Sequence, residues 1–527
     1  PRTFYEALLC LSAVRELFAT LEGVGISTLG HLDRHLYPYY AADLQAGRLS
    51  EAEAADLLGR YLLLTDLRFG VRHSGWAETS TTMTLGGCDA DGAPLYNDLT
   101  SLILRLHQEL GLLNPQPQCR VSARSDPRYL QELGAMVAAG RNTLAVFNDD
   151  VLIPAQQAMG KRLEDCRLYV NGGCQEPILL GREHSSGAHW YFNLPRVFEL
   201  TMRPDLLHGE WELPIIPLRR MAGFEDVYQA VMANLGAVLA AQTALERERG
   251  AAWPEVNPCP LISSTLADCT ARGKDYTSGG ARYAPTAICF VGFATLADSL
   301  NAIRLAVFER GLCRLDELLV ALATDYKGNE GLLAALRGLP HFGQDDAETD
   351  LFTARVAHDL AVLCRGQRNE RGGPFQPAMF SYANFLHMGA AVGATPDGRR
   401  AGEPLSQGAN PSRLARVPSA AHLLASLRRV DYRDYPAVAV FDLQLPCTRE
   451  RPRGDAACTA LLESFIRQGC PTVQCSLVDT RTLRDAQEHP ERHRDLVVRV
   501  AGFSAYFVTL ERQYQDEFIN RPQFNTP

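Results

Sequence analysis

The chain has 527 residues, of which 46% are hydrophobic and 21% are charged. These proportions are typical of a globular protein and exclude a disordered or fibrous chain. Lysine and arginine together number 52 against 61 acidic residues, and the resulting net charge of −9 argues against a nucleic-acid scaffold.

Helical periodicity and turn residues alternate along the whole chain. Ser50 and Glu53 form a capping box at the start of one apolar helix. The predicted helices cover residues 5–22, 54–64, 99–113, 127–141, 224–249, 294–311, 347–365 and 456–468. Short β-rich runs lie at residues 144–147, 287–291, 437–443 and 472–477. Strands that alternate with helices predict an α/β fold with buried strands.

The stretch Gly393–Pro411, GATPDGRRAGEPLSQGANP, is the clearest interruption rich in proline and glycine. Such a stretch is typical of loops or of a boundary before a C-terminal module. We therefore expect one domain over residues 1–394 and a C-terminal domain over residues 395–527. Residues 366–377 are a second candidate for a boundary.

The 14 cysteines are scattered and form no CxxC pair. This distribution predicts neither a disulfide framework nor a zinc or iron–sulfur site, so no metal is expected. No apolar run reaches the roughly 18–20 residues that a membrane span requires. We expect a protein of the reducing cytoplasm. Because the chain starts at Pro1, we also expect it to be a fragment or a processed product.

The first segment that could carry chemistry is Tyr169–Leu180, YVNGGCQEPILL. Its paired glycines permit backbone conformations and close packing that other residues resist. If Cys174 to Glu176 is extended, the thiol and the carboxylate point to the same side and Gln175 points away. A reactive sulfur beside an acid or base group is a sensible catalytic pair. The alternative is that Cys174 is a small buried hydrophobe and Glu176 a surface charge.

The second segment is Val497–Phe507, VVRVAGFSAYF. An apolar run leads into Gly502, and an aromatic-rich run follows it. A glycine inside such a run usually marks a bulge or a close approach of two backbones. Taken by itself, the segment leaves this structural explanation open.

Taken together, the two segments resemble the glycyl radical enzymes, the family of pyruvate formate-lyase. The C-terminal fingerprint of that family is a β-branched residue, any residue, Arg, a β-branched residue, a small residue, Gly and Tyr. Val497–Phe503 fits this pattern, with Phe503 where Tyr is usual. Further landmarks of the family are similar to DRHLYPYYAADLQAGRLSEAEAADLL, TLGGCDADG, FNDDVLIPAQQAMGKRLEDCRLYVNGGCQEP, ARGKDYTSGGARY, TPDGRRAGEPLSQGANPS and LERQYQDEFINR.

The resemblance implies a ten-stranded α/β barrel of two half-barrels surrounded by helices. The barrel is expected to be N-terminally incomplete, since family members usually begin earlier. Two finger loops should meet inside it, one bearing Cys174 and the other Gly502, the glycine of the radical domain. Arg499 and Phe503 are expected to support the radical loop, although Arg499 could instead be a surface cation.

The resemblance also implies how the radical arises and moves. A separate radical-AdoMet activating enzyme, with its own iron–sulfur cluster, abstracts a hydrogen from the α-carbon of Gly502, and no cofactor is bound. Gly502 then takes hydrogen from Cys174, and the Cys174 thiyl radical abstracts hydrogen from a small-molecule substrate. Relatives are usually homodimers, and no nucleic-acid or membrane partner is expected.

The residues around Cys174 favour one branch of the family. Gly173 and Gln175 flank Cys174, so the second cysteine of pyruvate formate-lyase itself is absent. The Cys-x-Glu pattern resembles the eliminating dehydratases and C–X lyases, in which Glu176 would be the general base. An arylacetate-type decarboxylase, a formate acetyltransferase-like enzyme, and an inactive or truncated relative stay as alternatives.

The residues expected to line the substrate pocket are Ser27, His189 and Trp190. Diol-cleaving members carry a Gly-His-Ser triplet, and this chain has Gly25 and Ile26 near the positions of its His and Ser. Those members also carry an Asp shortly after the cysteine loop, where this chain has Ala188. We therefore expect a bulkier and more aromatic pocket. The alternative is that His189 and Trp190 are ordinary packing residues.

Two other kinds of site use the same residues. A thiol hydrolase could pair Cys174 with His184 or His189, although closeness in sequence says little about such a pair. Zinc could bind Cys166, Cys174, His184 and His189, but these spacings fit no common structural zinc site.

Overall fold

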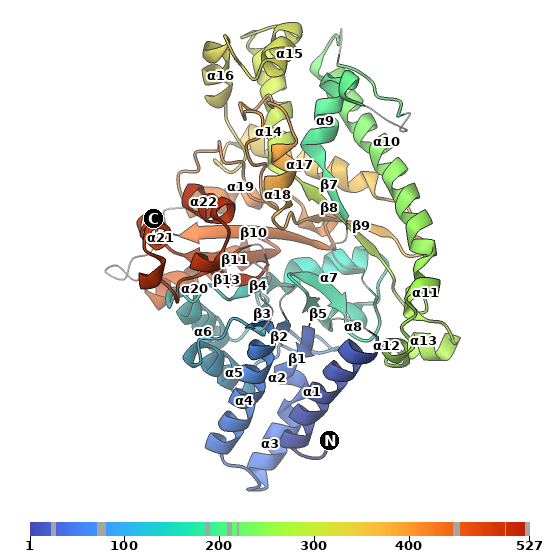
Figure 1. Ribbon diagram of the computed structural model, residues 1–527, viewed down its shortest axis with the longest axis vertical. Coiled ribbons are helices and arrows are strands. Elements are labelled where there is room, and N and C mark those ends of the chain that lie inside the picture. Colours follow the sequence, from blue (N-terminus) through green and yellow to red (C-terminus); the bar gives the residue numbers. More distant parts are fainter. Residues whose placement is uncertain are drawn as a thin grey trace. The chain divides into compact units, whose positions relative to one another are not determined.

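A computed structural model describes residues 1–22, 28–70, 81–184, 190–207, 213–218, 221–445, 454–500 and 502–521 (Figure 1). The chain forms two compact units, each assembled from segments that are distant in sequence. Unit 1 is built from residues 1–187, 253–284 and 442–524, and unit 2 from residues 188–252 and 285–441. The expected domains 1–394 and 395–527 stay a prediction.

Unit 1 contains a sheet in which β1 to β4 are parallel neighbours and β11 pairs antiparallel with β4. Two short antiparallel hairpins, β5–β6 and β12–β13, complete its strands. The strands of unit 1 are β1 (Thr28–His31), β2 (Thr82–Gly86), β3 (Gln116–Val121), β4 (Ala145–Asn148), β5 (Tyr169–Gly172), β6 (Glu176–Leu179), β11 (Thr472–Leu477), β12 (Val497–Arg499) and β13 (Ser504–Tyr506).

Three of these strands alternate polar and apolar residues although every residue in them is buried. Since side chains alternate between the faces of a strand, the polar ones share one face. The register aligns them, with Thr84 beside Gln118 on β3 and both Gln118 and Gln474 opposite Ala145 on β4. We call this face the polar row; it comprises Thr82, Thr84, Gln116, Gln118, Arg120, Gln474 and Ser476.

The opposite, apolar face of the sheet packs on helices. Tyr129 of α6 donates a hydrogen bond from its hydroxyl to the carbonyl of Leu85 on β2 at 3.2 Å. The helix α6 begins at Pro127 because the Asp126 side chain accepts a hydrogen bond from the Arg128 N–H at 2.8 Å. Helices α6 and α20 pack against each other in this unit (Figure 1).

The helices of unit 1 are α1 (Phe4–Leu21), α2 (Leu32–His35), α3 (Tyr37–Gln45), α4 (Glu51–Gly70), α5 (Asp98–Glu109), α6 (Pro127–Ala138), α7 (Asp149–Ala158), α8 (Leu163–Cys166), α11 (Trp253–Val256), α12 (Pro260–Ser264), α13 (Ala267–Arg272), α20 (Asp455–Arg467), α21 (Thr480–Glu488) and α22 (Arg512–Asn520). The capping box predicted before α4 is present, with the Ser50 N–H donating to Glu53 Oε2 at 2.8 Å.

Unit 2 contains four parallel strands in the order β7, β8, β9, β10. They are β7 (Trp190–Asn193), β8 (Thr286–Val291), β9 (Phe375–Met379) and β10 (Val438–Leu445), whose last residues belong to unit 1. Its helices are α9 (Leu194–Met202), α10 (Phe224–Ala251), α14 (Phe293–Ile303), α15 (Leu315–Ala323), α16 (Glu330–Arg337), α17 (Ala347–Leu363), α18 (Asn384–Ala390) and α19 (Ala420–Leu427).

The α/β class predicted from the sequence is confirmed, and each predicted helix and strand has a counterpart in the structure. The helix predicted over residues 294–311 ends as an α-helix at Ile303 and continues as a π-helix over Arg304–Glu309. No helix in the described ranges is both long and apolar enough to cross a membrane.

Candidate active site

The β5–β6 hairpin of unit 1 carries Cys174 in its turn. Three residues, Gly173 to Gln175, connect the strands, and Gly173 has a left-handed φ of +52° that the turn needs. The condition considered for Cys174 to Glu176, one extended stretch, is not met. Glu176 is the first residue of β6 and lies opposite Gly172, while Cys174 and Gln175 belong to the turn.

The polar row holds this hairpin by its backbone. Thr82 Oγ1 donates to the carbonyl of Asn171 at 2.5 Å, and Thr84 Oγ1 accepts from the Asn171 N–H at 3.0 Å. Gln118 Nε2 donates to the carbonyl of Cys174 itself at 3.0 Å. The sheet therefore fixes the Cys174 turn directly, through a bond to its own peptide group.

Arg120, the last member of the row on β3, anchors the start of the hairpin. Its Nη1 donates to the Tyr169 carbonyl at 2.9 Å, and its guanidinium makes bonds of 2.9 and 2.7 Å to the two carboxylate oxygens of Asp149. The Tyr169 hydroxyl donates to the same carboxylate at 2.7 Å. A buried bidentate pair of this kind gives strong geometric definition.

The β12–β13 hairpin of unit 1 carries Gly502. Val497, Val498 and Arg499 pair with Tyr506, Ala505 and Ser504, and the Val500 N–H donates to the Phe503 carbonyl at 2.8 Å. Gly502 has a left-handed φ of +100° at the tip. A glycine adopts this conformation without the strain that a side chain would cause.

Arg499 ties this hairpin to the same polar row. Its guanidinium donates to Gln474 Oε1 and Gln116 Oε1, and to the Thr143 carbonyl at 3.1 Å. It also donates to Ser504 Oγ at 3.2 Å, across the hairpin. Arg499 is 1% exposed, so the alternative of a surface cation is wrong. Burial lowers the pKa of Arg499 to about 10 against the opposing negative charge of Asp442, so Arg499 stays a cation at neutral pH.

The tips of the two hairpins meet. A Cβ atom built on Gly502 would overlap the Cβ of Cys174 and lie 3.2 Å from its Sγ. The α-carbon of Gly502 is thus placed directly against the thiol side chain, with no other residue between them. Cys174 and Gly502 are 328 positions apart in the sequence (502 − 174), and the fold brings them into contact within unit 1.

The surroundings of Cys174 keep its sulfur protonated. Burial raises the pKa of the Cys174 thiol to about 12; the negative charge of Glu176 adds to this shift, and Arg499 opposes it. A nucleophilic cysteine needs a lowered pKa, because the thiolate is the attacking species. A hydrogen-atom donor instead needs its S–H bond intact. The environment therefore favours hydrogen-atom chemistry over a thiol hydrolase. Cys174 itself is 8% exposed, and Glu176 is half-buried.

The other predicted residues are distributed differently. Phe503 is buried beside Gly502 in the second hairpin. Trp190 is half-buried at the start of β7 in unit 2, and its part in a substrate pocket stays a prediction. Ser27 and His189 lie outside the described residues. His184 makes an edge contact with the Tyr276 ring at 4.0 Å between centroids.

Of the four residues of the zinc alternative, the structure describes Cys166, Cys174 and His184. Within the described ranges, no group of three or more His, Cys, Asp and Glu side chains is arranged to hold a metal ion. Cys166 packs instead in a hydrophobic cluster with Phe147 and Leu152.

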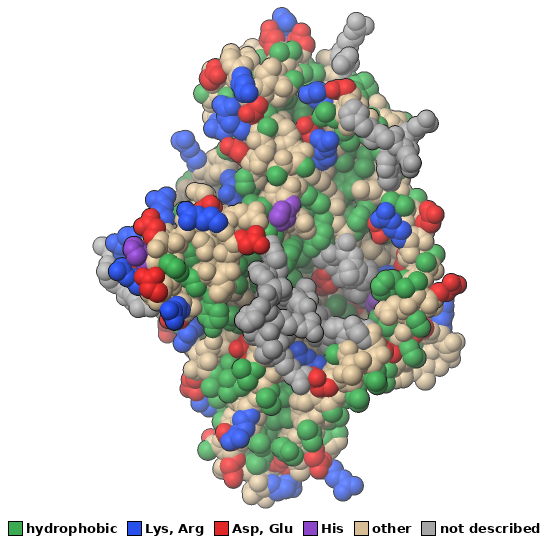
Figure 2. Space-filling view, in the orientation of Figure 1, with side chains coloured by type: hydrophobic (Ala, Val, Ile, Leu, Met, Phe, Trp, Pro, Cys, Tyr) green, Lys and Arg blue, Asp and Glu red, His purple; other side chains and the backbone are tan. Residues whose placement is uncertain are grey.

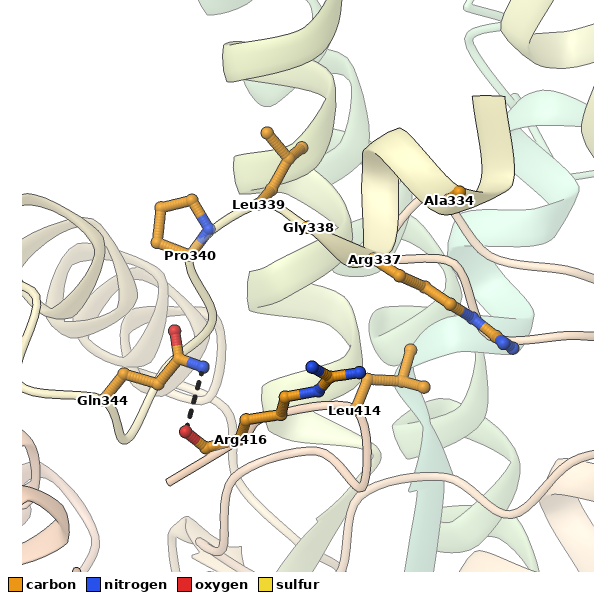
Figure 3. A pocket seen from close by; sticks show the side chains of 8 residues that line it. All are labelled: Ala334, Arg337, Gly338, Leu339, Pro340, Gln344, Leu414 and Arg416. Carbon is orange, nitrogen blue, oxygen red and sulfur yellow. Dashed lines mark hydrogen bonds between the residues drawn. The ribbon is translucent and has the colours of Figure 1, made fainter. Parts of the chain in front are cut away.

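Unit 2 has a pocket of its own, of about 710 Å³ (Figure 3). Ala334, Arg337, Gly338, Leu339, Pro340, Gln344, Leu414 and Arg416 line it, and Gln344 Nε2 donates to the Arg416 carbonyl at 3.3 Å. These residues supply neither a thiol nor a carboxylate. The pocket therefore lacks the groups that the two hairpins of unit 1 bring together.

Several residues that build the site were missed from the sequence, namely Gln116, Gln118, Gln474 and the threonines of β2. The alternation in QPQCRV and TVQCSL was the available signal for strands with one polar face. That signal does not distinguish a polar face in water from one covered by two hairpins.

Parallel strands that hold a cysteine-bearing turn against the α-carbon of a glycine are the arrangement of the glycyl radical enzymes. Residues 1–389 match the model described as pyruvate formate lyase-like, and residues 405–508 match the model described as glycine radical. The chain therefore belongs to the pyruvate formate lyase-like family and carries a glycine radical domain. The predicted membership is confirmed.

The chain is similar to several dehydratases of this family. It is 26% identical to the trans-4-hydroxy-L-proline dehydratase of Clostridioides difficile over 511 residues, 94% of this chain and 64% of that protein. It is 29% identical to the (2S)-3-sulfopropanediol dehydratase of Klebsiella oxytoca over 547 residues, 100% of this chain and 66% of that protein. The chain thus spans just under two thirds of the length of these relatives.

The fold is also similar to solved structures. A glycyl radical enzyme from Archaeoglobus fulgidus superimposes with a TM-score of 0.91 and 29% identity, covering 100% of this chain and 68% of that one. The glycyl radical enzyme fold predicted from the resemblance is confirmed by this match.

Proposed function

We propose that this chain is the catalytic part of a glycyl radical lyase or dehydratase, with Gly502 as the radical site, Cys174 as the thiyl site and Glu176 as the general base. The observation that carries the proposal is the contact between the Gly502 α-carbon and the Cys174 side chain. A contact of this kind permits transfer of a hydrogen atom between the two residues without any intervening group.

The first step stores the radical on Gly502. An activating enzyme of the radical-AdoMet class, with a reductant, removes one hydrogen atom from the Gly502 α-carbon. The radical is delocalised between the neighbouring amide nitrogen and carbonyl, and the missing side chain lets it become planar. Burial of Val500, Phe503 and Gly502 itself keeps water and oxygen from it.

The second step moves the radical to sulfur. The S–H bond of Cys174 breaks homolytically, its hydrogen atom forms the second C–H bond of Gly502, and the unpaired electron remains on Sγ. The raised pKa of Cys174 supports this step, since the thiol must hold its proton when the transfer occurs.

The third step eliminates a group from a small polar substrate. The thiyl radical takes a hydrogen atom from a carbon that bears a hydroxyl group. Glu176 accepts the hydroxyl proton, and the resulting ketyl-type radical expels the leaving group on the next carbon with its bonding electrons. The product radical then recovers the hydrogen atom from Cys174. The relatives named as dehydratases support this class of reaction. Ser27, His189 and Trp190 are proposed to line the pocket.

The proposed chemistry also requires a protein partner. The activating enzyme must reach Gly502, and we propose a soluble homodimer in the cytoplasm that acts together with it. No membrane or nucleic-acid partner is part of this proposal.

The test is anaerobic electron paramagnetic resonance after incubation with a radical-AdoMet activase, AdoMet and a one-electron reductant. We expect a doublet signal, because one α-hydrogen remains on Gly502, and cleavage of the chain near Gly502 after brief exposure to air. Cys174→Ala should keep the signal and lose all turnover, while Gly502→Ala should lose both. A related full-length enzyme, activated in parallel, shows that the activase works; absence of any signal from this chain would then refute the proposal.

A further inference from the structure

The strand β3 makes contact with both hairpins of the active site. Gln116 and Gln118 are two residues apart on this strand, and their side chains leave the same face. Two residues of a strand span about 6.6–6.8 Å. One of these side chains holds the cysteine turn, and the other holds the arginine of the glycine hairpin.

Gln118 acts on the backbone of Cys174. Its Nε2 donates to the Cys174 carbonyl at 3.0 Å, and the side chain is fully buried. Its Oε1 has no hydrogen-bond partner in the described part of the chain. A buried polar atom without a partner costs free energy, so an apolar residue would suit packing alone better. The hydrogen bond from Nε2 to the Cys174 turn therefore explains why Gln118 has an amide side chain at this position.

Gln116 acts on the glycine hairpin through Arg499. Its Oε1 accepts from Arg499 Nη1, while Gln474 accepts from Nε of the same guanidinium. Arg499 closes the hairpin by donating to Ser504 Oγ at 3.2 Å. Gln116 is also fully buried, and its Nε2 has no partner among the described residues. A neutral amide can accept from the guanidinium without adding a second buried charge beside Cys174.

We propose that Gln116 and Gln118 are positioning residues that set the separation between the α-carbon of Gly502 and Sγ of Cys174. This inference rests on the proposed function, because it concerns the transfer of hydrogen between those two atoms. The rigid spacing of β3 fixes the distance between the two amides, and each amide fixes one hairpin. A misplacement of about 1 Å in reacting groups can slow a reaction about 100-fold.

The experiment measures hydrogen exchange between Gly502 and Cys174 separately from formation of the radical. In D₂O the Cys174 thiol becomes S–D, and reversible transfer replaces the remaining α-hydrogen of the glycyl radical with deuterium. The doublet then collapses to a single line, at a rate that depends on the Gly502–Cys174 geometry. Cys174→Ala should form the radical and keep the doublet, which calibrates the measurement.

The variants are Gln118→Met and Gln116→Met, which keep the length of the side chain and remove the amide. We expect both to form the glycyl radical within about twofold of the wild-type yield and to slow the collapse of the doublet at least tenfold. Gln118→Asn, which keeps an amide but draws it back by one methylene, should also slow the collapse and tests the idea if the methionine variant fails to fold.

The matched control is Gln444→Met. Gln444 is equally buried in a strand, and its Nε2 donates to a backbone carbonyl too, that of Phe518 at 3.3 Å. This variant should exchange at the wild-type rate. Wild-type exchange in all variants at positions 116 and 118 would overturn the inference, and so would an equal slowing in Gln444→Met. Absence of a radical in the wild type would instead refute the proposed function.

Discussion

The Gly502 α-carbon lies so close to Cys174 that a methyl group at position 502 would overlap the Cβ of Cys174. The backbone of Gly502 also has a φ of +100°, where residues with a side chain are strained. Two independent physical reasons, contact and conformation, therefore require glycine at this position, apart from any radical chemistry.

The two reasons can be separated by mutation. Gly502→Ala should lower the free energy of unfolding by about 2–4 kcal/mol, because it adds both backbone strain and a clash. Gly469→Ala introduces strain at a φ of +73° with no atom within 4 Å of the new methyl group, and should cost about 1 kcal/mol. Urea unfolding of both variants checks this difference. Equal losses would mean that the hairpin tips are not in contact in solution.

The buried thiol of Cys174 should resist alkylation. Its pKa, raised to about 12 chiefly by burial, leaves very little thiolate at pH 8. Cys10 is exposed on α1 and serves as the internal control. Mass spectrometry after treatment with iodoacetamide at pH 8 should find Cys10 modified and Cys174 intact. Rapid modification of Cys174 at this pH would favour a nucleophilic cysteine and count against a hydrogen-atom donor.

Hydrophobic periodicity sufficed to predict the long helices and the apolar strands, because the apolar residues that recur along these elements are the residues that they bury. For example, the strand predicted over residues 287–291 is β8, Thr286–Val291. The strands β2 and β3 were not predicted, since Thr82, Thr84, Gln116 and Gln118 interrupt the apolar run that a buried strand usually shows. Their polar face is buried because it binds the backbone of the β5–β6 hairpin and the guanidinium of Arg499 from the β12–β13 hairpin.

The residues of the site and the meeting of the Cys174 and Gly502 loops were predicted by resemblance, while the local geometry of the Cys174 turn was not. Spacing alone suggested that Cys174 and Glu176 point the same way from an extended strand, but Gly173 turns the chain there instead. No local pattern could show that Gly502 meets Cys174, because the contact depends on how two separate hairpins rest on one sheet. Arg499 could have been an exposed cation by its sequence context, and its burial follows from the acceptors Gln116 and Gln474.

The ion pair of Arg120 and Asp149 should matter greatly for stability. Both side chains are buried, and Asp149 accepts from Arg120 and from the Tyr169 hydroxyl. Asp149→Asn leaves the guanidinium without its counter-charge, so we expect a loss of about 3–5 kcal/mol. The exposed pair Arg60 and Asp56 is the control, and Asp56→Asn should leave the unfolding midpoint unchanged. Thermal and urea unfolding measure both; a small effect of Asp149→Asn would show that water reaches Arg120.

Asp298 of α14 should make the fold less stable as the pH rises from about 4 to about 7. Burial raises the pKa of this carboxyl to about 7, against the opposing effects of His341 and of the Phe342 N–H, which donates to Asp298 Oδ1 at 2.8 Å. The folded pKa exceeds the unfolded value of about 3.9, so the stabilisation is complete below pH 4 and is lost as the pH rises through 7. Asp298→Asn keeps the acceptor for Phe342 and removes the charge. Relative to the wild type, this variant should gain on the order of 2 kcal/mol between pH 5 and pH 8 in urea unfolding. A difference that does not change with pH would mean that Asp298 titrates near its ordinary pKa.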